Sequence, residues 1–286
     1  MEPLNRTIIR EGGGFPGRPF EFESAANLTG FPLMHGVTRR FGGVSQKPFD
    51  SFNLGLHVDD QVQAVVENRR RLAKHLRVRL EELTCAKQVH GISIAQVTEF
   101  NRGYGSTSLQ QAIPDSDAMI TNLPKTPLLL LVADCVPVLF YDVRYHAIAV
   151  VHAGWRGAIG HLPALTLDAM AEAYGTSAAD CYAYLGPSIQ ADSFEVSETL
   201  ADQFRKETTR PNEIVYYRYR SDKEIETPRV DLQQFIVHDL LDKGVPLRQI
   251  TVSGTDTLTS PSCYSYRREH GKTGRMALFA MLSARP

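Results

Sequence analysis

Four short apolar segments follow one another in the centre of the sequence with no helical segment between them. They are residues Ala118–Thr121, Leu128–Val132, Val138–Tyr141 and Ala147–Val151, and each has the length and composition of a buried β-strand. A doubly wound parallel sheet needs a crossover helix between neighbouring strands, so this succession argues against that architecture. The sequence therefore predicts an α/β (α+β) fold in which helices cover mixed or largely antiparallel sheets.

The flanking segments predict further strands and several helices. Gly175 follows a helical segment at the position where a left-handed residue commonly ends a helix, and Asp231 is placed to cap the start of another helix. Residues 216–228 are rich in charge and are interpreted as a loop. The additional strands are predicted at residues 31–37, 83–89, 93–97, 181–185, 249–253 and 275–280, and the helices at residues 60–76, 158–174, 198–206 and 231–244.

The chain of 286 residues is interpreted as one domain preceded by an extension. Residues 1–30 contain Gly12 to Gly14 close to Pro16 and Pro19 and are predicted to be an N-terminal extension that is partly loop, whereas residues 31–286 form the single domain. This extension has no continuous apolar core, which argues against a secretory signal. The longest apolar run, residues 128–140, is too short to span a bilayer.

Charge and cysteine content narrow the partners and the compartment. The chain has 31 Lys and Arg against 32 Asp and Glu, so its net charge of −1 favours neither nucleic acid nor an anionic membrane as a partner. A small-molecule partner is the default expectation, and the oligomeric state does not follow from the sequence. The four cysteines lack CxxC spacing, which fits a protein of the reducing cytoplasm.

Three segments place a residue that can bind a metal at or near the end of a predicted strand. They are QVHG with His90, ADCVP with Cys135 and VHAGW with His152. Imidazole nitrogen and thiolate sulfur are good zinc ligands, and three protein ligands leave a fourth position for water or substrate. The spacing alone is weak, because a single buried Cys or His more often serves packing or hydrogen bonding.

Nine ordered segments between about residue 31 and the C-terminus resemble one known family. The multicopper polyphenol oxidase family, also called the laccase-like, YfiH-type or peptidoglycan-editing-factor family, has similar motifs in the same order. The resemblance implies a laccase-like catalytic domain over residues 31–286 with an α-β-β-α layered arrangement of mixed sheets, related to cysteine-hydrolase-like folds. The segments are TRRFGGVS, NLGLHVDD, NRRRLAKHL, QVHG, SDAMIT, ADCVPVLFYD, VHAGWRG, LGPSI and YSYRREHGKTGRMA.

The resemblance also implies a metal site and a substrate class. The family's zinc ligands fall on His90, Cys135 and His152 of this sequence. Family members are described as purine nucleoside phosphorylases that also deaminate adenosine and cleave methylthioadenosine. The resemblance therefore implies phosphorolysis of adenosine, inosine, guanosine and methylthioadenosine, with adenosine deamination at the same site. Purine nucleosides and phosphate are the implied partners, and Zn²⁺ is the implied cofactor.

Phosphorolysis requires cationic donors for orthophosphate, and five arginines near family motifs are candidates for this contact. A surface or structural ion pair is the commoner role for any one arginine. Arg156 is expected near the start of a helix, where the helix dipole also favours an anion. The candidates are Arg39, Arg40, Arg156, Arg267 and Arg268.

Asp134 and Arg40 are the candidate catalytic residues beside the predicted metal ligands. Asp134 is placed to orient a ligand or to exchange a proton with the leaving base. The alternative is a purely structural role as a turn-forming side chain. Asp117 in SDAMIT has the same two alternatives, a role at the site or a structural role, and the structural role is favoured. Trp155 is either a stacking surface for a purine or a packing anchor.

Several other functions stay open at this point. Cys135 with His152 or His90 also suits a metal-independent Cys-His hydrolase, and the peptidoglycan-editing name suggests a murein precursor as substrate. A zinc ion that merely clamps sheet ends in a binding module is a third class. A four-copper oxidase is disfavoured because the sequence contains no His-x-His, although one His2Cys site can take copper in vitro.

Overall fold

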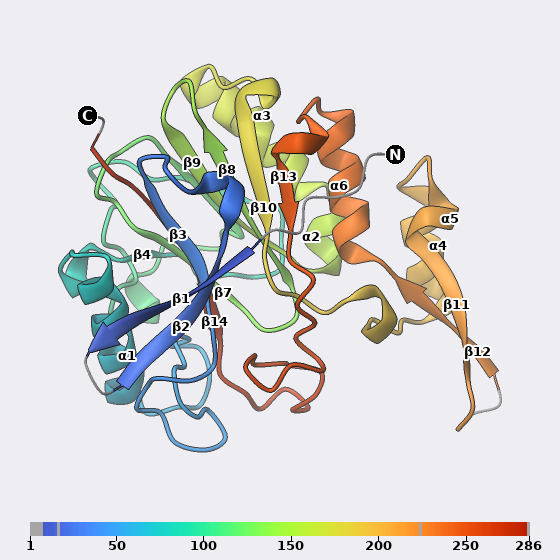
Figure 1. The fold of residues 1–286 in the computed structure, drawn as a ribbon, viewed down its shortest axis with the longest axis horizontal. Coiled ribbons are helices and arrows are strands. Elements are labelled where there is room, and N and C mark those ends of the chain that lie inside the picture. Colours follow the sequence, from blue (N-terminus) through green and yellow to red (C-terminus); the bar gives the residue numbers. More distant parts are fainter. Residues whose placement is uncertain (1–7, 16–17, 223–224, 285–286) are drawn as a thin grey trace.

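Two six-stranded sheets dominate the computed structural model, which describes residues 8–15, 18–222 and 225–284 (Figure 1). In the first sheet the strand order is β1-β2-β3-β14-β7-β4, and all pairs are antiparallel except β4 with β7. Its strands are β1 (Ile8–Phe15), β2 (Arg18–Ala25), β3 (Leu33–Thr38), β4 (Thr84–Cys85), β7 (Leu128–Val132) and β14 (Met276–Leu282).

The second sheet has the order β13-β10-β8-β9-β6-β5, with parallel pairs at its two edges. A separate two-stranded sheet joins β11 (Val215–Arg220) to β12 (Ile225–Val230). The strands of the second sheet are β5 (Ile94–Gln96), β6 (Ala118–Thr121), β8 (Val136–Asp142), β9 (Ala147–Ala153), β10 (Cys181–Leu185) and β13 (Ile250–Val252).

The two sheets pack face to face, and alternating side chains of β7 show how. Leu128, Leu130 and Val132 belong to the core between the sheets, whereas Leu129 and Leu131 belong to a separate core on the outer face of the first sheet. Successive side chains of a strand point to opposite faces, so a strand that is buried on both faces is apolar throughout. This explains the uninterrupted run LLLLV.

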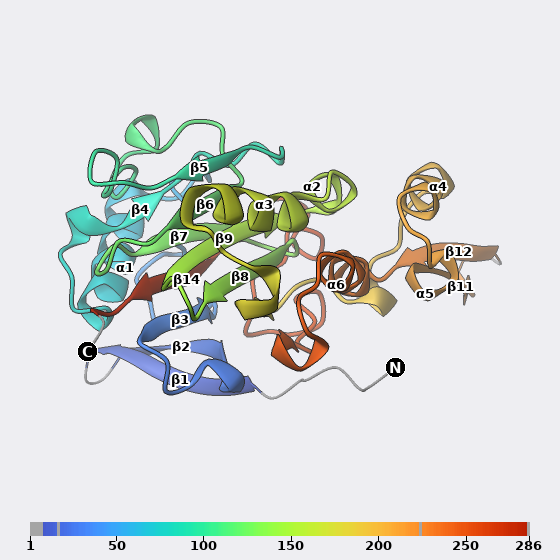
Figure 2. The same cartoon turned by 90° about the horizontal axis from the view of Figure 1, so that it is seen from above.

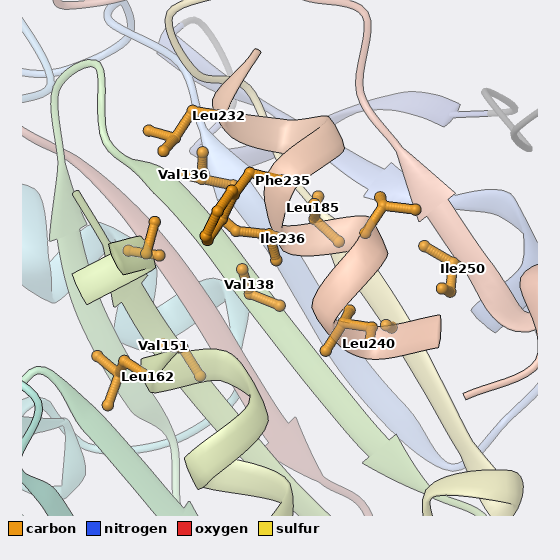
Figure 3. Packing of buried hydrophobic residues seen from close by; sticks show 14 of the residues in the cluster. Val136, Val138, Val151, Leu162, Leu185, Leu232, Phe235, Ile236, Leu240 and Ile250 are labelled. Carbon is orange, nitrogen blue, oxygen red and sulfur yellow. The ribbon is translucent and has the colours of Figure 1, made fainter. Parts of the chain in front are cut away.

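Helices cover the outer face of each sheet. The helix α1 (Val62–His75) packs with β2, β7 and β14 in the outer core of the first sheet. On the second sheet, α3 (Leu162–Tyr174) packs against β9, where Leu162 lies beside Val151 (Figure 3). The helix α6 (Leu232–Asp242) places Phe235 and Ile236 near Val136 and Val138 of β8. Figure 2 shows the resulting order of helix, sheet, sheet and helix. The predicted α-β-β-α layering is therefore confirmed.

Several boundaries agree with the sequence. The strands β6, β7 and β10 and the helix α4 (Glu198–Lys206) have the predicted limits. Gly175 has a positive φ of 77° after α3, and the side chain of Asp231 accepts a hydrogen bond from the backbone N–H of Gln234 at the start of α6. The predicted helix over 158–174 is instead two helices, α2 (Trp155–Ile159) and α3, because His161 between them is left-handed.

The N-terminal segment differs most from its prediction. Among the described residues of the predicted extension, 8–15 and 18–25 are strands rather than loop, and β2 pairs with β3 in the first sheet. The buried Phe20 and Phe22 alternate with Glu21, and Phe20 stacks on Phe52 with ring centroids 4.5 Å apart. This period-two burial anchors β2 to the core despite the glycines before it. Residues 1–7 lie outside the described residues.

The charged segment 216–228 was also predicted incorrectly as a loop. It forms most of the β11–β12 hairpin, which lies with α4 and α5 (Pro211–Ile214) apart from the two large sheets (Figure 1). Tyr217 and Tyr219 are exposed, so this strand lacks the apolar alternation that marks a core strand. Within the described part of the chain, no helix has the length and apolar character needed to cross a membrane.

Candidate metal and active site

The turn Ala133–Cys135 carries the chain from one large sheet to the other. β7 ends at Val132 in the first sheet and β8 begins at Val136 in the second. Asp134 in this turn has a φ of 89°, which is a strained conformation for a residue with a side chain. The crossing accounts for a carboxylate and a thiol in the middle of an apolar stretch, because the backbone leaves both cores there.

The loop that carries His90 crosses between the same two sheets. It joins β4 of the first sheet to β5 of the second, and His90 has a positive φ of 59°. The buried carboxylate of Asp117 accepts hydrogen bonds from the backbone N–H groups of Val89, His90 and Gly91 at 3.1, 3.0 and 2.7 Å. One side chain thus fixes the unusual backbone that presents His90.

Asp117 also positions the second imidazole. His152 lies near the end of β9, opposite Pro137 of β8, and its Nδ1 is 2.8 Å from Asp117 Oδ1. Burial alone raises the pKa of Asp117, but the hydrogen bonds from His152 and the loop N–H groups outweigh it and lower that pKa. Because the ionised carboxylate only accepts, Nδ1 of His152 is the donor and Nε2 is left for another contact.

The ligand atoms of His90, Cys135 and His152 all lie within 4.8 Å of one another. Among the described residues, no other group of three or more His, Cys, Asp or Glu side chains converges in this way. Gly154 lies against the cluster, where an added Cβ would be 3.0 Å from Cys135 Sγ and 3.5 Å from His90 Cδ2. Glycine at 154 therefore leaves room for the converging side chains. The structure thus contains a possible His-Cys-His metal site.

The electrostatics of the cluster favour a thiolate. Burial raises the pKa of Cys135, but the charges and hydrogen bonds of His152 and His90 outweigh burial and lower this pKa. For His152, burial lowers the pKa, and the effects of Cys135 and Asp117 outweigh it and raise the pKa. A thiolate is the form of cysteine that binds metals or acts as a nucleophile, so both chemistries are compatible with the arrangement.

The cluster opens into a cavity of about 700 Å³ at the end of the sandwich. One part of its wall comes from the first sheet and its loops and includes His57, Gln88 and Arg275. Another part comes from α2 and the segment after β10. It includes Trp155, Arg156 and Phe194, and the C-terminal loop between β13 and β14 adds Tyr266 and Arg267.

Four further residues of the sequence prediction line this cavity. Asp134 Oδ1 accepts a hydrogen bond from the Thr257 hydroxyl at 2.6 Å, and its Oδ2 accepts one from the Arg267 backbone N–H at 2.7 Å. Both oxygens therefore tie the C-terminal loop to the turn that holds Cys135. The guanidinium of Arg156 lies 4.1 Å from the Trp155 ring centroid, and that of Arg267 lies 5.1 Å from the Phe194 ring centroid.

Three predicted arginines do not line the cavity. Arg39 is buried and contacts Glu23, Thr255 and Cys263. Arg40 forms ion pairs with Asp50 and Glu269, and Arg268 donates to a set of loop carbonyl oxygens. Carboxylates and carbonyls from elsewhere in the chain engage these guanidinium groups, and the sequence pattern gave no sign of those partners.

Sequence reasoning assigned no role to several residues that do line the cavity. They include His57, Gln88, Phe194, His270 and Arg275. Burial and the neighbouring charge of Arg275 lower the pKa of His57 to about 4, so its imidazole is neutral near pH 7. Arg275 had one usable signal in the sequence. It immediately precedes a buried strand inside the YSYRREHGKTGRMA motif.

Comparison with known sequences identifies the family. Residues 34–283 match the family described as multi-copper polyphenol oxidoreductase laccase. The chain belongs to this family. Purine nucleoside phosphorylase YlmD of Bacillus subtilis (strain 168) is 36% identical over 252 residues, which are 86% of this chain and 87% of the relative. A purine nucleoside phosphorylase of Bacteroides thetaiotaomicron is 32% identical over 260 residues, which cover 91% and 94% of the two chains.

Solved structures of family members share the fold. The Bacillus licheniformis hypothetical protein YfiH has a TM-score of 0.85 and 31% identity, over 94% of this chain and 98% of that protein. YlmD from Geobacillus stearothermophilus also has a TM-score of 0.85, with 32% identity over 95% and 99% of the two chains. The family resemblance and the layered fold class predicted from the sequence are both confirmed.

Proposed function

We propose that this protein is a zinc-dependent purine nucleoside enzyme that combines phosphorolysis with adenosine deamination at one site. The proposed phosphorolysis substrates are adenosine, inosine, guanosine and methylthioadenosine. The observation that carries the proposal is the convergence of His90, Cys135 and His152 on a cavity lined by arginines and aromatic rings. The relatives named purine nucleoside phosphorylase, at 32–36% identity over most of the chain, support the substrate class.

The donor set fits zinc. A tetrahedral zinc ion with ligands at about 2.0–2.3 Å needs donor atoms about 3.5 Å apart, and the three ligand atoms already lie within 4.8 Å of one another. Asp117 supports His152 as carboxylates commonly support histidine ligands of zinc. When bound, zinc supplies Lewis acidity that activates water for deamination. Copper can occupy the same ligands in vitro, and we expect any polyphenol oxidation from it to be incidental.

The remaining groups suit a nucleoside and an anion. Trp155, Phe194 and Tyr266 offer aromatic faces of the kind on which a purine stacks, and the cavity is large enough for a drug-sized ligand. Of the arginines predicted to bind phosphate, Arg156 and Arg267 line the cavity and remain our candidates. The bonds of Asp134 to Thr257 and Arg267 support a positioning role beside its proposed catalytic one.

Product analysis tests the proposal directly. Purified protein is incubated with adenosine or inosine, with and without orthophosphate, and the products are separated chromatographically. We expect hypoxanthine and ribose-1-phosphate from inosine only when phosphate is present, and inosine and ammonia from adenosine without phosphate. Zinc bound in stoichiometric amount together with absence of all these products would refute the proposed activity.

One observation favours a second candidate, a metal-independent Cys-His hydrolase. Asp117, His152 and Cys135 form a carboxylate-imidazole-thiol series of the kind that activates a nucleophilic cysteine. The second imidazole distinguishes the two functions, because His90 also hydrogen-bonds Cys135 and a triad has no need of it. Metal analysis of protein purified without chelating resin separates the candidates. Stoichiometric zinc that is absent from Cys135→Ala and that protects the thiol from alkylation would exclude the hydrolase.

We place the protein in the cytoplasm, where its thiol stays reduced. All four cysteines are free in the structure, and Cys85, Cys181 and Cys263 are buried. A thiolate ligand is compatible with a reducing compartment, whereas secreted proteins commonly pair their cysteines. Labelling of the thiols in freshly lysed cells tests this, and we expect Cys135 to be the site that reacts after zinc is removed.

A further inference from the structure

Arg275 occupies a fixed position beside the turn that carries Cys135. It immediately precedes β14, whose first residue Met276 pairs with Val132, the last residue of β7. The Arg275 backbone N–H donates to Asn53 Oδ1 at 2.9 Å. Its side-chain stem packs on the 53–57 loop, where a Cβ added at Gly55 would be 2.9 Å from Arg275 Cγ. The guanidinium is therefore held at the end of the first sheet, next to the metal-ligand cluster.

The contacts of Arg275 leave much of its donor capacity available. Nη1 donates to the carbonyl oxygens of Thr273 and Gly274 at 2.8 and 3.1 Å, and the guanidinium lies 5.6 Å from the Tyr266 ring centroid. No carboxylate among residues 8–15, 18–222 and 225–284 forms an ion pair with it. Arg39 and Arg40, by contrast, each pair with acidic side chains.

The charge balance of the cavity wall points to an anionic ligand. Three guanidinium groups, those of Arg156, Arg267 and Arg275, line the cavity with one carboxylate, that of Asp134. Both oxygens of Asp134 are already engaged by Thr257 and by the Arg267 backbone. Arg275 is half-buried, and its printed hydrogen bonds go to backbone carbonyl oxygens rather than to a carboxylate, so the protein compensates this cation incompletely. An incompletely compensated, partly buried cation is stabilised when an anion binds beside it.

All three cavity arginines lie over aromatic rings, but they come from different parts of the wall. Arg156 is exposed and lies over Trp155, and Arg267 lies over Phe194 and donates to the Glu195 carbonyl oxygen at 2.7 Å. Arg275 comes instead from the first-sheet wall and lines the cavity together with Cys135. A phosphate that reacts with a nucleoside has to lie beside the reacting centre rather than beside the purine face.

We propose that Arg275 is the principal orthophosphate-binding residue of the cavity and that it selects phosphorolysis over deamination. This inference rests on the proposed function. The planar guanidinium suits bidentate recognition of phosphate oxygens, and a lysine in its place would offer only a point charge. Deamination consumes water rather than phosphate, so it does not need this contact. Arg275 thus separates the two activities that share one site.

The experiment compares Arg275→Gln and Arg275→Lys with the wild type and with Arg70→Gln. Arg70 is an exposed arginine paired with Glu67 on α1, so its variant removes one positive charge away from the cavity. Three quantities are measured on zinc-loaded protein: the KM for phosphate in inosine phosphorolysis, kcat for adenosine deamination without phosphate, and the Kd for inorganic phosphate by calorimetry.

We expect Arg275→Gln to raise the KM and Kd for phosphate by about 10- to 100-fold, the usual effect of losing a charged hydrogen bond. We expect Arg275→Lys to recover part of this loss, and deamination to change by less than about 3-fold in both variants, since deamination uses no phosphate. Phosphate constants within about 2-fold of wild type in Arg275→Gln, or an equal fall of both activities, would overturn the inference, since a structural arginine would affect both.

The same measurements separate this inference from the proposed function. If wild-type protein forms no phosphorolysis products, the proposed function fails. In that case, phosphate that binds the wild type and not Arg275→Gln would still support an anion site at Arg275. If the wild type binds no phosphate by calorimetry, the anion site itself is refuted. If the wild type phosphorolyses inosine and Arg275→Gln does so with an unchanged phosphate KM, only the inference about Arg275 fails.

Discussion

Two polar clusters in this protein each contain a cysteine, a carboxylate and cationic or titratable neighbours. In one, the closed cluster, the polar side chains bind one another, whereas the other, the open cluster, borders the cavity. In the closed cluster, Arg39 contacts Glu23, Thr255 and Cys263, and Glu23 also accepts a hydrogen bond from the Tyr184 hydroxyl at 3.0 Å. Every one of these side chains except that of Thr255 is buried. In the open cluster, the ligand atoms of His90, Cys135 and His152 converge at the cavity.

The difference indicates which polar groups of this fold are available to bind a ligand. The closed cluster uses its hydrogen-bonding groups on one another, so Cys263 accepts from Arg39 at 2.9 Å and has no access to a ligand. The open cluster uses Asp117 to hold His90 and His152, and all three candidate ligands line the cavity. Polar groups that are held in place without being saturated are the ones that bind metals and substrates.

The largest expected effect is on the two cysteines. Cys135→Ser removes the thiolate ligand, and we expect it to lose zinc and to lower both activities by at least about 1000-fold, since Lewis-acid stabilisation is worth several kcal/mol. Cys263→Ser, the matched change in the closed cluster, should retain stoichiometric zinc and activity. Elemental analysis and steady-state kinetics measure both. Full activity in zinc-free Cys135→Ser would show that Cys135 does not hold a zinc ion needed for activity, and the two clusters would then not differ in function.

Breaking the closed cluster should instead affect stability. Glu23→Gln leaves Arg39 as a buried cation without its acidic partner, and such a loss costs about 3–5 kcal/mol of unfolding free energy. Urea unfolding followed by circular dichroism gives the change, and zinc content per folded molecule should stay near one. Loss of zinc without loss of stability would mean that the closed cluster acts on the site.

The sequence grouped the three residues that converge in the open cluster, but it did not predict the architecture that brings them together. Cys135 and the two histidines followed from ordered family motifs, whereas the convergence depends on two loops that cross between the same sheets, which no local pattern shows. Asp117 was left ambiguous because its hydrogen-bond partners lie 26 to 35 residues away. Arg39 and Arg40 were predicted at the site for the same reason, since Glu23 and Glu269 are distant in sequence.

For the fold, periodicity predicted the buried strands and missed those at the periphery. The segment LLLLV is apolar because it is buried on both faces, so the strand β7 was predictable. The β11–β12 hairpin contains exposed tyrosines and charged residues, and only its end residues Val215 and Val230 reach the core, so its sequence lacks the pattern of a core strand. The strands of the N-terminal segment were hidden by glycines. In the first sheet β2 pairs with β3, and β3 pairs in turn with β14 from the C-terminal end of the chain.

A smaller effect is expected when the support of the open cluster is weakened. Asp117→Asn keeps the side-chain volume but removes the charge that holds the His90 loop and His152, and we expect zinc affinity to fall by about 10- to 100-fold. Chelator competition measures this affinity. Asp142→Asn is the matched control, because Asp142 is also buried and accepts from backbone N–H groups, at the other end of β8. Equal losses in both variants would point to general destabilisation.

The smallest expected effect concerns His35, which lies beside the closed cluster with its ring centroid 6.1 Å from that of Tyr184. Burial lowers the pKa of His35 to about 4, and its Nε2 accepts from the Ala25 backbone N–H at 3.1 Å. The pKa of His35 in the unfolded chain is near 6.5, so as the pH falls from 6.5 towards 4 the unfolded chain binds the proton and the folded chain does not. The contribution to stability is therefore complete above about pH 6.5 and is lost progressively towards pH 4.

His35→Gln isolates this contribution, because glutamine can accept the same hydrogen bond and does not titrate. Between pH 7 and pH 5.5 we expect the wild type to lose about 1 kcal/mol more unfolding free energy than the variant, from the linkage of proton binding to folding. Urea unfolding at the two pH values gives the difference, and the other histidines cancel because both proteins contain them. A wild type and a variant with parallel pH profiles would show that His35 is protonated as readily in the folded chain as in the unfolded one. In that case the region beside the closed cluster would be less shielded from solvent than its contacts indicate.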